Sequence, residues 1–445
     1  MKISAVFACL VCRAIHGLLR LINRGGTALP GKLALKICPD VLKILAQKVK
    51  VIAVTGTNGK TTSVRMLETA LDKAGFSVFS NRSGANLISG ITAEFILHAD
   101  MFGRPQCEWA VIECDEAASK RVTAQLNPKV LLVTNLFRDQ LDRYGSVYSP
   151  RDSIAAGAAS SPETLLCLNA DCPLAASIGE LTPNGKIYFG LSYGSKTGPE
   201  SGESAECPVC RGKMRYSWLS YANLGAFDCP FCGFSRHRPD VSVDGVTGDG
   251  YILSAHGRRH FGTVALPGLY NVYNAAGAIA AFTAAGFEPD EAISAAADFD
   301  CGFGRMERFA LGKNGARMIL IKNAAAADQT LEYIKSSAAP KIIAFVINSR
   351  TADGTDISWL NDADFGKLRT VRGLTRVYAA GERAEDIKNR LKTEEIACEV
   401  CMTYDKLIEN LYSENNEIFI LPTYTAMMEL RKKLVRRLGG SQFWE

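Results

Sequence analysis

A β-rich apolar run, a short glycine-containing loop and a helical pattern follow one another between Lys48 and Lys73. This order is typical of a phosphate-binding loop, because the backbone N–H groups of such a loop and the N-terminus of the next helix attract anions. Gly56 and Gly59 permit the tight turn and the close approach of the backbone to a phosphate. Val54 occupies the position of the first glycine in the standard loop, so the spacing is a variant of it. The predicted nucleotide-binding residues are Gly56, Thr57, Asn58, Gly59, Lys60, Thr61 and Thr62.

The side chains around this loop suit a nucleoside triphosphate. Lys60 is placed to reach the β- and γ-phosphates, and the hydroxyl of Thr61 is placed to bind Mg²⁺. Glu113 ends the apolar run 109–114, at the kind of strand end where ligands of parallel sheets bind. We therefore predict Glu113 as a second magnesium ligand and, with Lys60, as a catalytic residue. The alternative carboxylates are Asp115 and Glu116.

Apolar runs separated by helical patterns continue along the chain. They lie at 109–114, 129–134, 164–169, 318–322, 341–347, 375–380 and 417–421. Strands that alternate with helices predict an α/β fold with a parallel sheet covered on both faces. From about residue 185 to 262 glycine, serine and paired cysteines dominate, which predicts a small inserted module. The predicted organisation is an amphipathic lead-in at 1–45, an ATPase domain at 46–305 and a second α/β, Rossmann-like domain at 306–445.

Two CxxC pairs separated by 18 residues lie in that module, within an insert at about 195–240. Their spacing is typical of a zinc ribbon. Because four thiolates leave no open coordination position, we expect the Zn²⁺ to be structural. The predicted ligands are Cys207, Cys210, Cys229 and Cys232. Two other pairs lack partner pairs and are predicted to be buried thiols, namely Cys9 with Cys12 and Cys398 with Cys401.

The first 24 residues combine the apolar run Ile3–Val11 with several basic residues. The run is shorter than the roughly 20 residues that span a bilayer, and no small-residue cleavage site follows it. We therefore expect neither a membrane span nor a signal peptide. Apolar residues at helical spacing predict an amphipathic helix that either packs as a surface helix or contacts an anionic membrane face. These residues are Leu10, Ala14, Leu18 and Leu21.

Several motifs, in this order, resemble the Mur ligase superfamily. They are 55–62, 133–136 with 139–142, 168–171, 268–276 and 304–307. The resemblance implies a Mur ligase-type fold that binds ATP and Mg²⁺. It also implies that Asn271 and Asn274, at a helix start near adenine, and Arg305, at a hinge, bind the nucleotide. For the two asparagines the alternative is helix capping and core contact.

Departures from the superfamily pattern narrow the resemblance. The phosphate loop begins near residue 55, which leaves too few residues for the usual nucleotide-sugar-binding domain, and Gln140 stands where histidine is usual. Together with the ribbon and the segments 25–32, 353–359 and 423–427, these features resemble the MurT branch. Members of that branch are Mur ligase-like subunits of lipid II isoglutaminyl synthase.

This resemblance implies an ATP-dependent carbon–nitrogen ligase of the cytoplasm. It would amidate the D-glutamate α-carboxylate of the lipid II stem peptide to D-isoglutamine through an acyl phosphate, with contact at the inner face of the cell membrane as a further expectation. No Ser-His-Asp or Cys-His pair is evident, so ammonia is expected from a separate GatD-type glutamine amidotransferase. Asp356 is expected to complete the catalytic triad of that partner. The alternative is that Asp353 and Asp356 cap the next helix with Ser358.

Three other functions stay open at this point. An amino-acid-adding ligase such as folylpolyglutamate synthase is disfavoured by the short N-terminus and the ribbon. A nucleic-acid-binding ATPase is disfavoured because 51 basic against 46 acidic residues give a net charge of only +5. A scaffold that has lost catalysis is disfavoured by Lys60 and Thr61.

Overall fold

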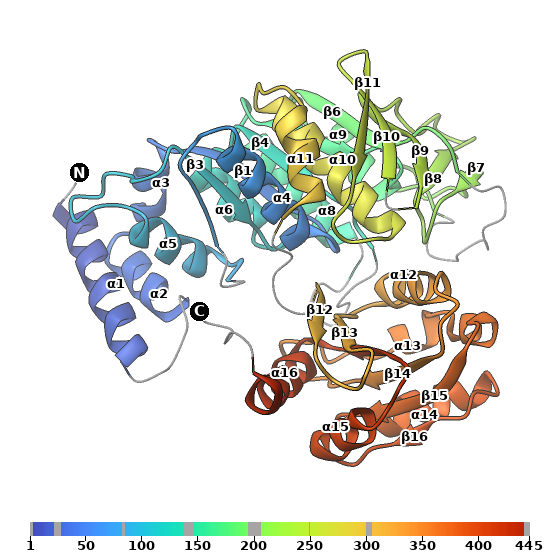
Figure 1. Cartoon of the computed structure of the whole chain (residues 1–445). Helices are drawn as coiled ribbons and strands as arrows, with labels where there is room; N and C mark the ends of the chain where they lie inside the picture. The colour runs from blue at the N-terminus through green and yellow to red at the C-terminus, as the bar shows by residue number, and fades with distance from the viewer. Residues whose placement is uncertain are drawn as a thin grey trace. The chain divides into compact units, whose positions relative to one another are not determined.

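The computed structural model describes residues 3–21, 28–81, 85–137, 146, 148–194, 206–248, 250–299 and 305–439 (Figure 1). They form two compact units. The described residues up to Phe299 belong to the first unit, and those from Arg305 onward belong to the second.

A nine-stranded sheet forms the centre of the first unit, in the order β11-β10-β9-β6-β5-β4-β1-β3-β2. Its strands are β1 (Lys50–Thr55), β2 (Val78–Ser80), β3 (Trp109–Glu113), β4 (Val130–Val133), β5 (Leu165–Asn169), β6 (Lys186–Leu191), β9 (Val241–Thr247), β10 (Gly250–Ala255) and β11 (Arg258–Thr263). The strands from β2 to β6, with β9, pair in parallel, and every residue of β3 and β4 is buried. The predicted parallel α/β sheet is confirmed.

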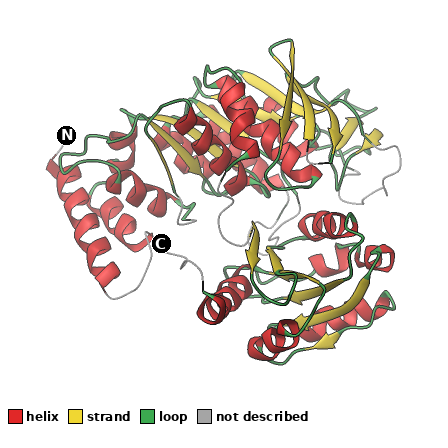
Figure 2. Ribbon diagram, viewed as in Figure 1, coloured by secondary structure: helices red, strands yellow, loops and turns green. Residues whose placement is uncertain are grey.

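Helices cover both faces of this sheet (Figures 1 and 2). The helices α4 (Lys60–Lys73), α10 (Leu269–Ala284) and α11 (Asp290–Ala297) pack together on one face. The helices α6 (Ser119–Leu126), α8 (Tyr148–Ala159) and α9 (Pro173–Leu181) pack on the other. Because β1 has β4 on one side and β3 on the other, the strand order reverses direction at β1. The carboxyl ends of these three strands therefore border one crevice, where ligands of open α/β sheets bind.

The predicted inserted module at 185–262 is wrong in its extent. β6 and the strands β9 to β11 belong to the main sheet, with β10 antiparallel to both of its neighbours. Among the described residues of this segment, the strands outside the main sheet are β7 (Arg215–Leu219) and β8 (Gly225–Asp228), which pair as a two-stranded sheet near the cysteine pairs. β10 alternates buried and half-exposed residues, as antiparallel strands with one solvated face do. Such strands lack the continuous apolar runs that identified the others.

Four helices pack beside β2 and β3 and share one apolar core with them. They are α1 (Ile3–Leu21), α2 (Ala28–Ile37), α3 (Val41–Ala46) and α5 (Ile88–Leu97). The predicted amphipathic helix is confirmed as α1. Its length corrects the expectation that no segment can span a bilayer, because α1 is long and apolar enough by length and composition alone. Buried core helices and signal sequences meet the same criterion.

The second unit has a six-stranded sheet in the order β12-β13-β17-β14-β15-β16. Its strands are β12 (Arg305–Phe309), β13 (Ala316–Ile319), β14 (Lys341–Val346), β15 (Leu374–Ala380), β16 (Glu399–Val400) and β17 (Glu417–Pro422). Its helices are α12 (Ala324–Lys335), α13 (Trp359–Asp362), a 3₁₀ helix (Phe365–Thr370), α14 (Ala384–Thr393), α15 (Tyr404–Tyr412) and α16 (Tyr424–Leu438). All pairs are parallel except β12 with β13, and the predicted second α/β fold is confirmed.

Candidate active site and zinc site

The predicted phosphate loop connects the end of β1 to the start of α4, as the sequence indicated. Gly56 and Gly59 have φ values of 125° and 85°, which side chains disfavour. Neither position has room for a side chain. A Cβ on Gly56 would lie 2.3 Å from Oγ1 of Thr134, and one on Gly59 would lie 2.0 Å from Oδ1 of Asn274. The loop is therefore tightly enclosed by its neighbours.

The residues that follow β4 hold this loop in place. Thr57 N donates to the Asn135 carbonyl at 2.8 Å, and Asn58 N donates to Oδ1 of Asn135 at 2.9 Å. The Asn58 carbonyl accepts from Oγ1 of Thr134 at 2.7 Å and from Nδ2 of Asn135 at 3.1 Å. Phe137 N donates to Oγ1 of Thr57 at 3.0 Å. These bonds fix the loop before a nucleotide arrives, and they explain why the 133–136 motif accompanies it.

Lys60 is the first residue of α4, and its ammonium lies over the loop. Nζ donates to the Gly56 carbonyl, and it forms an ion pair of 3.0 Å with Oε1 of Glu116. Both side chains of this pair are largely buried. A cation at this place, beside the N-terminus of α4, is suited to bind phosphate oxygens.

Thr61 and Glu113 also come together as predicted. Oγ1 of Thr61 donates to Oε2 of Glu113 at 2.5 Å, and Nδ2 of Asn86 donates to the other carboxylate oxygen at 3.3 Å. Asn81 fixes the backbone of Glu113 through two bonds of 2.8 Å. A hydroxyl and a carboxylate side by side are hard oxygen donors, which fit the ligand preference of Mg²⁺.

The structure separates the three candidate carboxylates by their contacts. Glu113 reaches Thr61 and Glu116 reaches Lys60, whereas Oδ1 of Asp115 accepts from the N–H groups of Ala117 and Ala118. Asp115 therefore stabilises the turn before α6, and Glu113 has the contacts expected of a magnesium ligand.

The two predicted asparagines lie at the start of α10. Nδ2 of Asn274 donates to Oδ1 of Asn271 at 3.1 Å, and Nδ2 of Asn271 donates to the Pro267 carbonyl at 3.2 Å. Because Asn274 also packs against Gly59, the structure brings this helix to the phosphate loop. Thr62, in the first turn of α4, is buried.

Several predicted features lie wholly or partly outside the described residues, among them residues 195–205 of the predicted insert. The motif 139–142, with Gln140, lies outside them, as do Gly304 and the residues 25–27 of the segment 25–32. For Arg305 the structure gives the backbone, at the start of β12, but not the side chain.

A buried ion pair that sequence reasoning missed lies after β5, which β4 separates from β1 in the sheet. Asp171, directly after β5, is fully buried and accepts from Nε of Arg236 at 2.6 Å, from Leu191 N at 2.8 Å and from the hydroxyl of Tyr273 at 2.7 Å. Burial raises the pKa of this carboxyl, while the guanidinium opposes the shift. Arg236 follows the second cysteine pair and Tyr273 lies on α10. Asp171 therefore links the cysteine-containing segment to α10.

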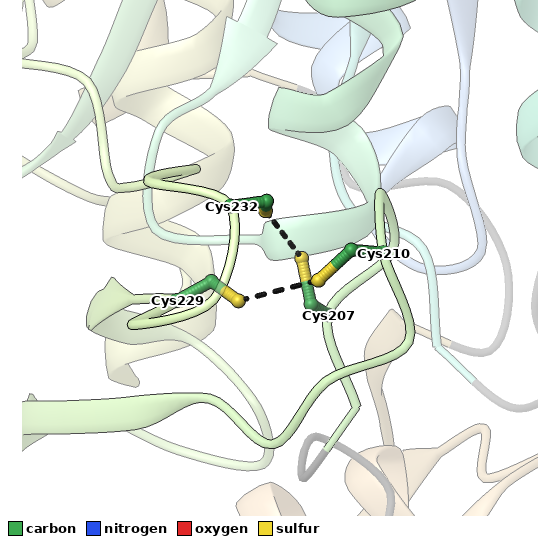
Figure 3. Close-up of side chains that lie close together, drawn as sticks. All are labelled: Cys207, Cys210, Cys229 and Cys232. Atoms are coloured by element: carbon green, nitrogen blue, oxygen red, sulfur yellow. Dashed lines mark hydrogen bonds between the residues drawn. The ribbon is translucent and has the colours of Figure 1, made fainter.

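The four predicted zinc ligands form one cluster (Figure 3). Their Sγ atoms all lie within 4.8 Å of one another. Sγ of Cys207 lies 3.6 Å from that of Cys232, and Sγ of Cys210 lies 3.5 Å from that of Cys229. Four thiolates around Zn²⁺ at about 2.3 Å would be about 3.8 Å apart, so the donor set fits a tetrahedral zinc site.

The other cysteine pairs are outside any such cluster. Cys9, Cys12 and Cys401 are buried as predicted, whereas Cys398 is only half-buried. Burial raises the pKa of Cys12 and of Cys398 to about 12. These thiols therefore stay protonated and unreactive at neutral pH.

Asp356 lies on the loop that follows β14 in the second unit. Its Oδ1 accepts from Ser358 N at 2.8 Å, which is a turn contact just before α13 and not a cap of that helix. The loop is fastened by Asp353, which accepts from the N–H of Thr425 at 2.6 Å and from its hydroxyl at 2.5 Å. Asp356 is half-buried, and the structure describes this one hydrogen bond to it.

Each of the two units contains a segment that matches a known protein family. Residues 54–207 match the Mur ligase middle domain, and residues 320–427 match the MurT ligase C-terminal family. The MurT subunit of the glutamine-hydrolysing lipid II isoglutaminyl synthase of Streptococcus pneumoniae is 33% identical, over 98% of this chain and 98% of that protein. The protein of the same description from Staphylococcus aureus is 29% identical, over 95% and 96%.

Solved structures show the same fold. A pseudomurein peptide ligase type C from Methanothermus fervidus superimposes with a TM-score of 0.69 at 22% identity, covering 88% of this chain and 79% of that chain. A MurF ligase from Thermotoga maritima, in complex with ADP, superimposes with a TM-score of 0.62 at 14% identity, covering 91% and 84%.

Proposed function

Since this chain belongs to the MurT family of lipid II isoglutaminyl synthase subunits, we propose that it is an ATP-dependent ligase that amidates lipid II. The group amidated is the D-glutamate α-carboxylate of the stem peptide, which becomes D-isoglutamine. The observation that carries this proposal is the enclosed phosphate loop with Lys60 and the Thr61–Glu113 pair, in a chain that matches a relative of that name over almost its whole length.

The reaction needs activation of the carboxylate, because a carboxylate is a poor electrophile. A carboxylate oxygen attacks the γ-phosphorus of ATP, the bond to the β-phosphate oxygen breaks, and ADP leaves an acyl phosphate on the substrate. Such a transfer requires mainly positioning and neutralisation of charge. Lys60 and the N–H groups at the start of α4 would supply positive charge at the phosphates. Thr61 and Glu113 would hold Mg²⁺, which neutralises phosphate charge when it is bound.

Other residues would hold the nucleotide in line. Asn271 and Asn274, at the start of α10, and Arg305, at the start of β12, are proposed to bind it on the basis of the family resemblance. The contact between Asn274 and Gly59 supports this role, because it places an amide at the loop. Glu116 would keep the ammonium of Lys60 oriented toward the loop between turnovers.

Ammonia completes the reaction. Its nitrogen attacks the acyl carbon, the bond from carbon to the phosphate oxygen breaks, and inorganic phosphate and a proton are released. We propose that a GatD-type glutamine amidotransferase supplies the ammonia, and that Asp356 fixes the catalytic histidine of that partner. A glutaminase histidine needs a third group to set its tautomer and to stabilise its charged form. The half-buried carboxylate of Asp356, on a fastened loop, suits that role.

The four-cysteine cluster is proposed to bind a structural Zn²⁺, because four thiolates fill a tetrahedral site. No nucleic-acid partner is proposed. Because the substrate is lipid-linked, we place the reaction in the cytoplasm at the inner face of the cell membrane.

Product analysis tests the function. The purified chain is incubated with lipid II, ATP, Mg²⁺ and ammonium chloride, and the stem peptide is examined by mass spectrometry. We expect one carboxyl to be replaced by a carboxamide, with one ADP formed per amide. Addition of an amino acid residue instead would indicate an amino-acid-adding ligase, and ATP-independent or absent conversion would contradict the proposal.

A further inference from the structure

The apolar stripe of α1 faces away from the core. Ile3, Phe7, Leu18 and Leu21 are 90%, 57%, 60% and 83% exposed, and Leu10 is 43% exposed. They recur every three or four residues or at multiples of that spacing, so they lie on one side of the helix. None of these side chains belongs to the core that α1 shares with its neighbours.

The opposite side of the helix fixes this orientation. Ala5, Ala8, Cys9 and Cys12 are buried in that core. Arg13 donates hydrogen bonds to the carbonyls of Ile96, at 2.6 Å, and Ala99, at the end of α5. Rotating the apolar stripe inward would break these contacts. The contacts on the opposite side of α1 therefore keep the apolar stripe exposed.

The segment around the stripe is basic. Residues 1–39 contain six basic residues and no Asp or Glu, and the first acidic residue of the chain is Asp40. The described basic residues of this segment include Arg20, Lys32 and Lys36, which are all exposed. The two lysines lie on α2, which packs against α1. An exposed apolar stripe in a segment with basic and no acidic residues matches the surface of an anionic bilayer, with acyl chains beneath negative headgroups.

We propose that α1 and α2 form a docking surface for anionic phospholipid, with α1 lying in the plane of the membrane. The apolar stripe would enter the boundary between headgroups and acyl chains, and the basic residues would contact the phosphates. A membrane-spanning α1 would have to abandon its buried face and the bonds of Arg13. This surface rests on the proposed function in one respect, because a lipid-linked substrate gives membrane docking its purpose.

Vesicle sedimentation tests the surface directly. The full chain, alone and with a co-purified glutaminase, is mixed with vesicles of phosphatidylcholine or of phosphatidylcholine with phosphatidylglycerol. We expect binding to the anionic vesicles that weakens with added salt, and at least about tenfold weaker binding to neutral ones. The double variants Phe7→Gln with Leu18→Gln and Lys32→Gln with Lys36→Gln should each lower the anionic partition by at least about tenfold.

Matched variants at other exposed sites control for the loss of apolar or basic side chains in general. Phe102 and Met402 are exposed apolar residues elsewhere, and Lys313 and Lys392 are exposed lysines of the second unit. Changing either pair to Gln removes the same chemistry and should leave vesicle binding unchanged. Because all the changed side chains are exposed, thermal unfolding should be unaffected in every variant.

Any other outcome would contradict the proposed docking surface. It fails if the wild-type chain ignores anionic vesicles, if the glutaminase abolishes binding, or if the control pairs weaken binding equally. Resistance of the bound chain to alkaline extraction would show a membrane span instead. A change in oligomeric state of the Phe7→Gln with Leu18→Gln variant would show that the stripe covers a second copy. Amidation of detergent-dispersed lipid II, unchanged in these variants, separates failure of this surface from failure of the proposed function.

Discussion

Gly59 and Gly75 share a φ of 85°, yet only Gly59 is hemmed in by other atoms. Gly75→Ala should lose about 1–2 kcal/mol of stability from backbone strain and keep its ATP turnover. Gly59→Ala adds a clash with Asn274, so the loop must shift, and kcat/KM for ATP should fall about 100-fold. Denaturant unfolding and ATP hydrolysis measured on both variants check this. Equal turnover in the two would show that the loop does not position phosphates.

Lys60 provides a second test at this scale. Lys60→Ala removes the ammonium at the phosphate loop, and ATP hydrolysis and amidation should fall at least about 100-fold while the fold remains. Lys73→Ala, at the other end of the same helix, removes an equal charge and should leave the rates of ATP hydrolysis and amidation nearly unchanged. Circular dichroism and an assay of both reactions suffice. Substantial residual activity in Lys60→Ala would remove Lys60 from the site.

The roles of single residues could be predicted only in part from the sequence. The loop residues and the four cysteines could be predicted because spacing alone carries their chemistry. The prediction of Glu113 rests on its place at a strand end. The contacts that distinguish it from Asp115 and Glu116 depend on the direction in which each side chain leaves the end of β3, which the sequence does not indicate. Asp171 and Arg236 are 65 residues apart, and nothing local in the sequence indicates their pairing.

The ribbon and the main sheet are joined through Arg236. Arg236→Gln leaves the buried carboxylate of Asp171 without its cation, which should cost about 3–5 kcal/mol of stability. Burial raises the pKa of Asp171, so this carboxyl binds a proton more readily in the folded than in the unfolded chain. Stability of the variant should therefore fall as pH rises through the window between the unfolded and the raised folded pKa.

Urea unfolding at about pH 5 and about pH 8 measures this effect. The deficit of Arg236→Gln relative to wild type should be smaller at the lower pH, because the raised pKa of this carboxyl favours proton binding as the pH falls. A deficit that grows on acidification would mean that Asp171 is stabilised by its remaining N–H and hydroxyl donors in the charged form.

Zinc binding by the four-cysteine cluster is expected to stabilise the ribbon. Metal analysis of protein purified without chelator should find one zinc per chain. Cys207→Ser should lower Tm by several degrees and change turnover less, since a closed four-thiolate site contributes folding energy. Cys107→Ser, a half-exposed thiol outside the cluster, is the control. Absence of zinc from the wild-type chain would refute the metal site.

Elements were predictable where their apolar pattern is continuous. β3, β4 and β5 are buried parallel strands, and the apolar runs predict each of them to within two residues. The strands β9 to β11 were absorbed into a supposed insert, because half-exposed antiparallel strands resemble loops in composition. The periodicity of α1 was evident, but which side faces the core was decided by the small residues that pack there.

At the scale of the whole molecule, the second unit is expected to serve the partner glutaminase. Asp356→Asn should suppress glutamine hydrolysis and glutamine-dependent amidation by the complex at least about 100-fold, since a neutral amide cannot stabilise an imidazolium. Amidation with added ammonium should persist, because the phosphate loop is untouched. Asp362→Asn, also an acid on this segment, serves as the control. Loss of both activities, or of neither, would rule out a role of Asp356 in the partner's triad and leave it as a turn residue before α13.

The transfer of a carboxylate oxygen to phosphate tests the central claim most directly. Lipid II labelled with oxygen-18 in the D-glutamate α-carboxylate is converted with ATP, Mg²⁺ and ammonium, and the inorganic phosphate is analysed by mass spectrometry. The account predicts one labelled oxygen in phosphate for each carboxamide formed, because the acyl phosphate breaks at its carbon–oxygen bond. Amide formation with unlabelled phosphate, or ATP turnover without amide, would contradict it.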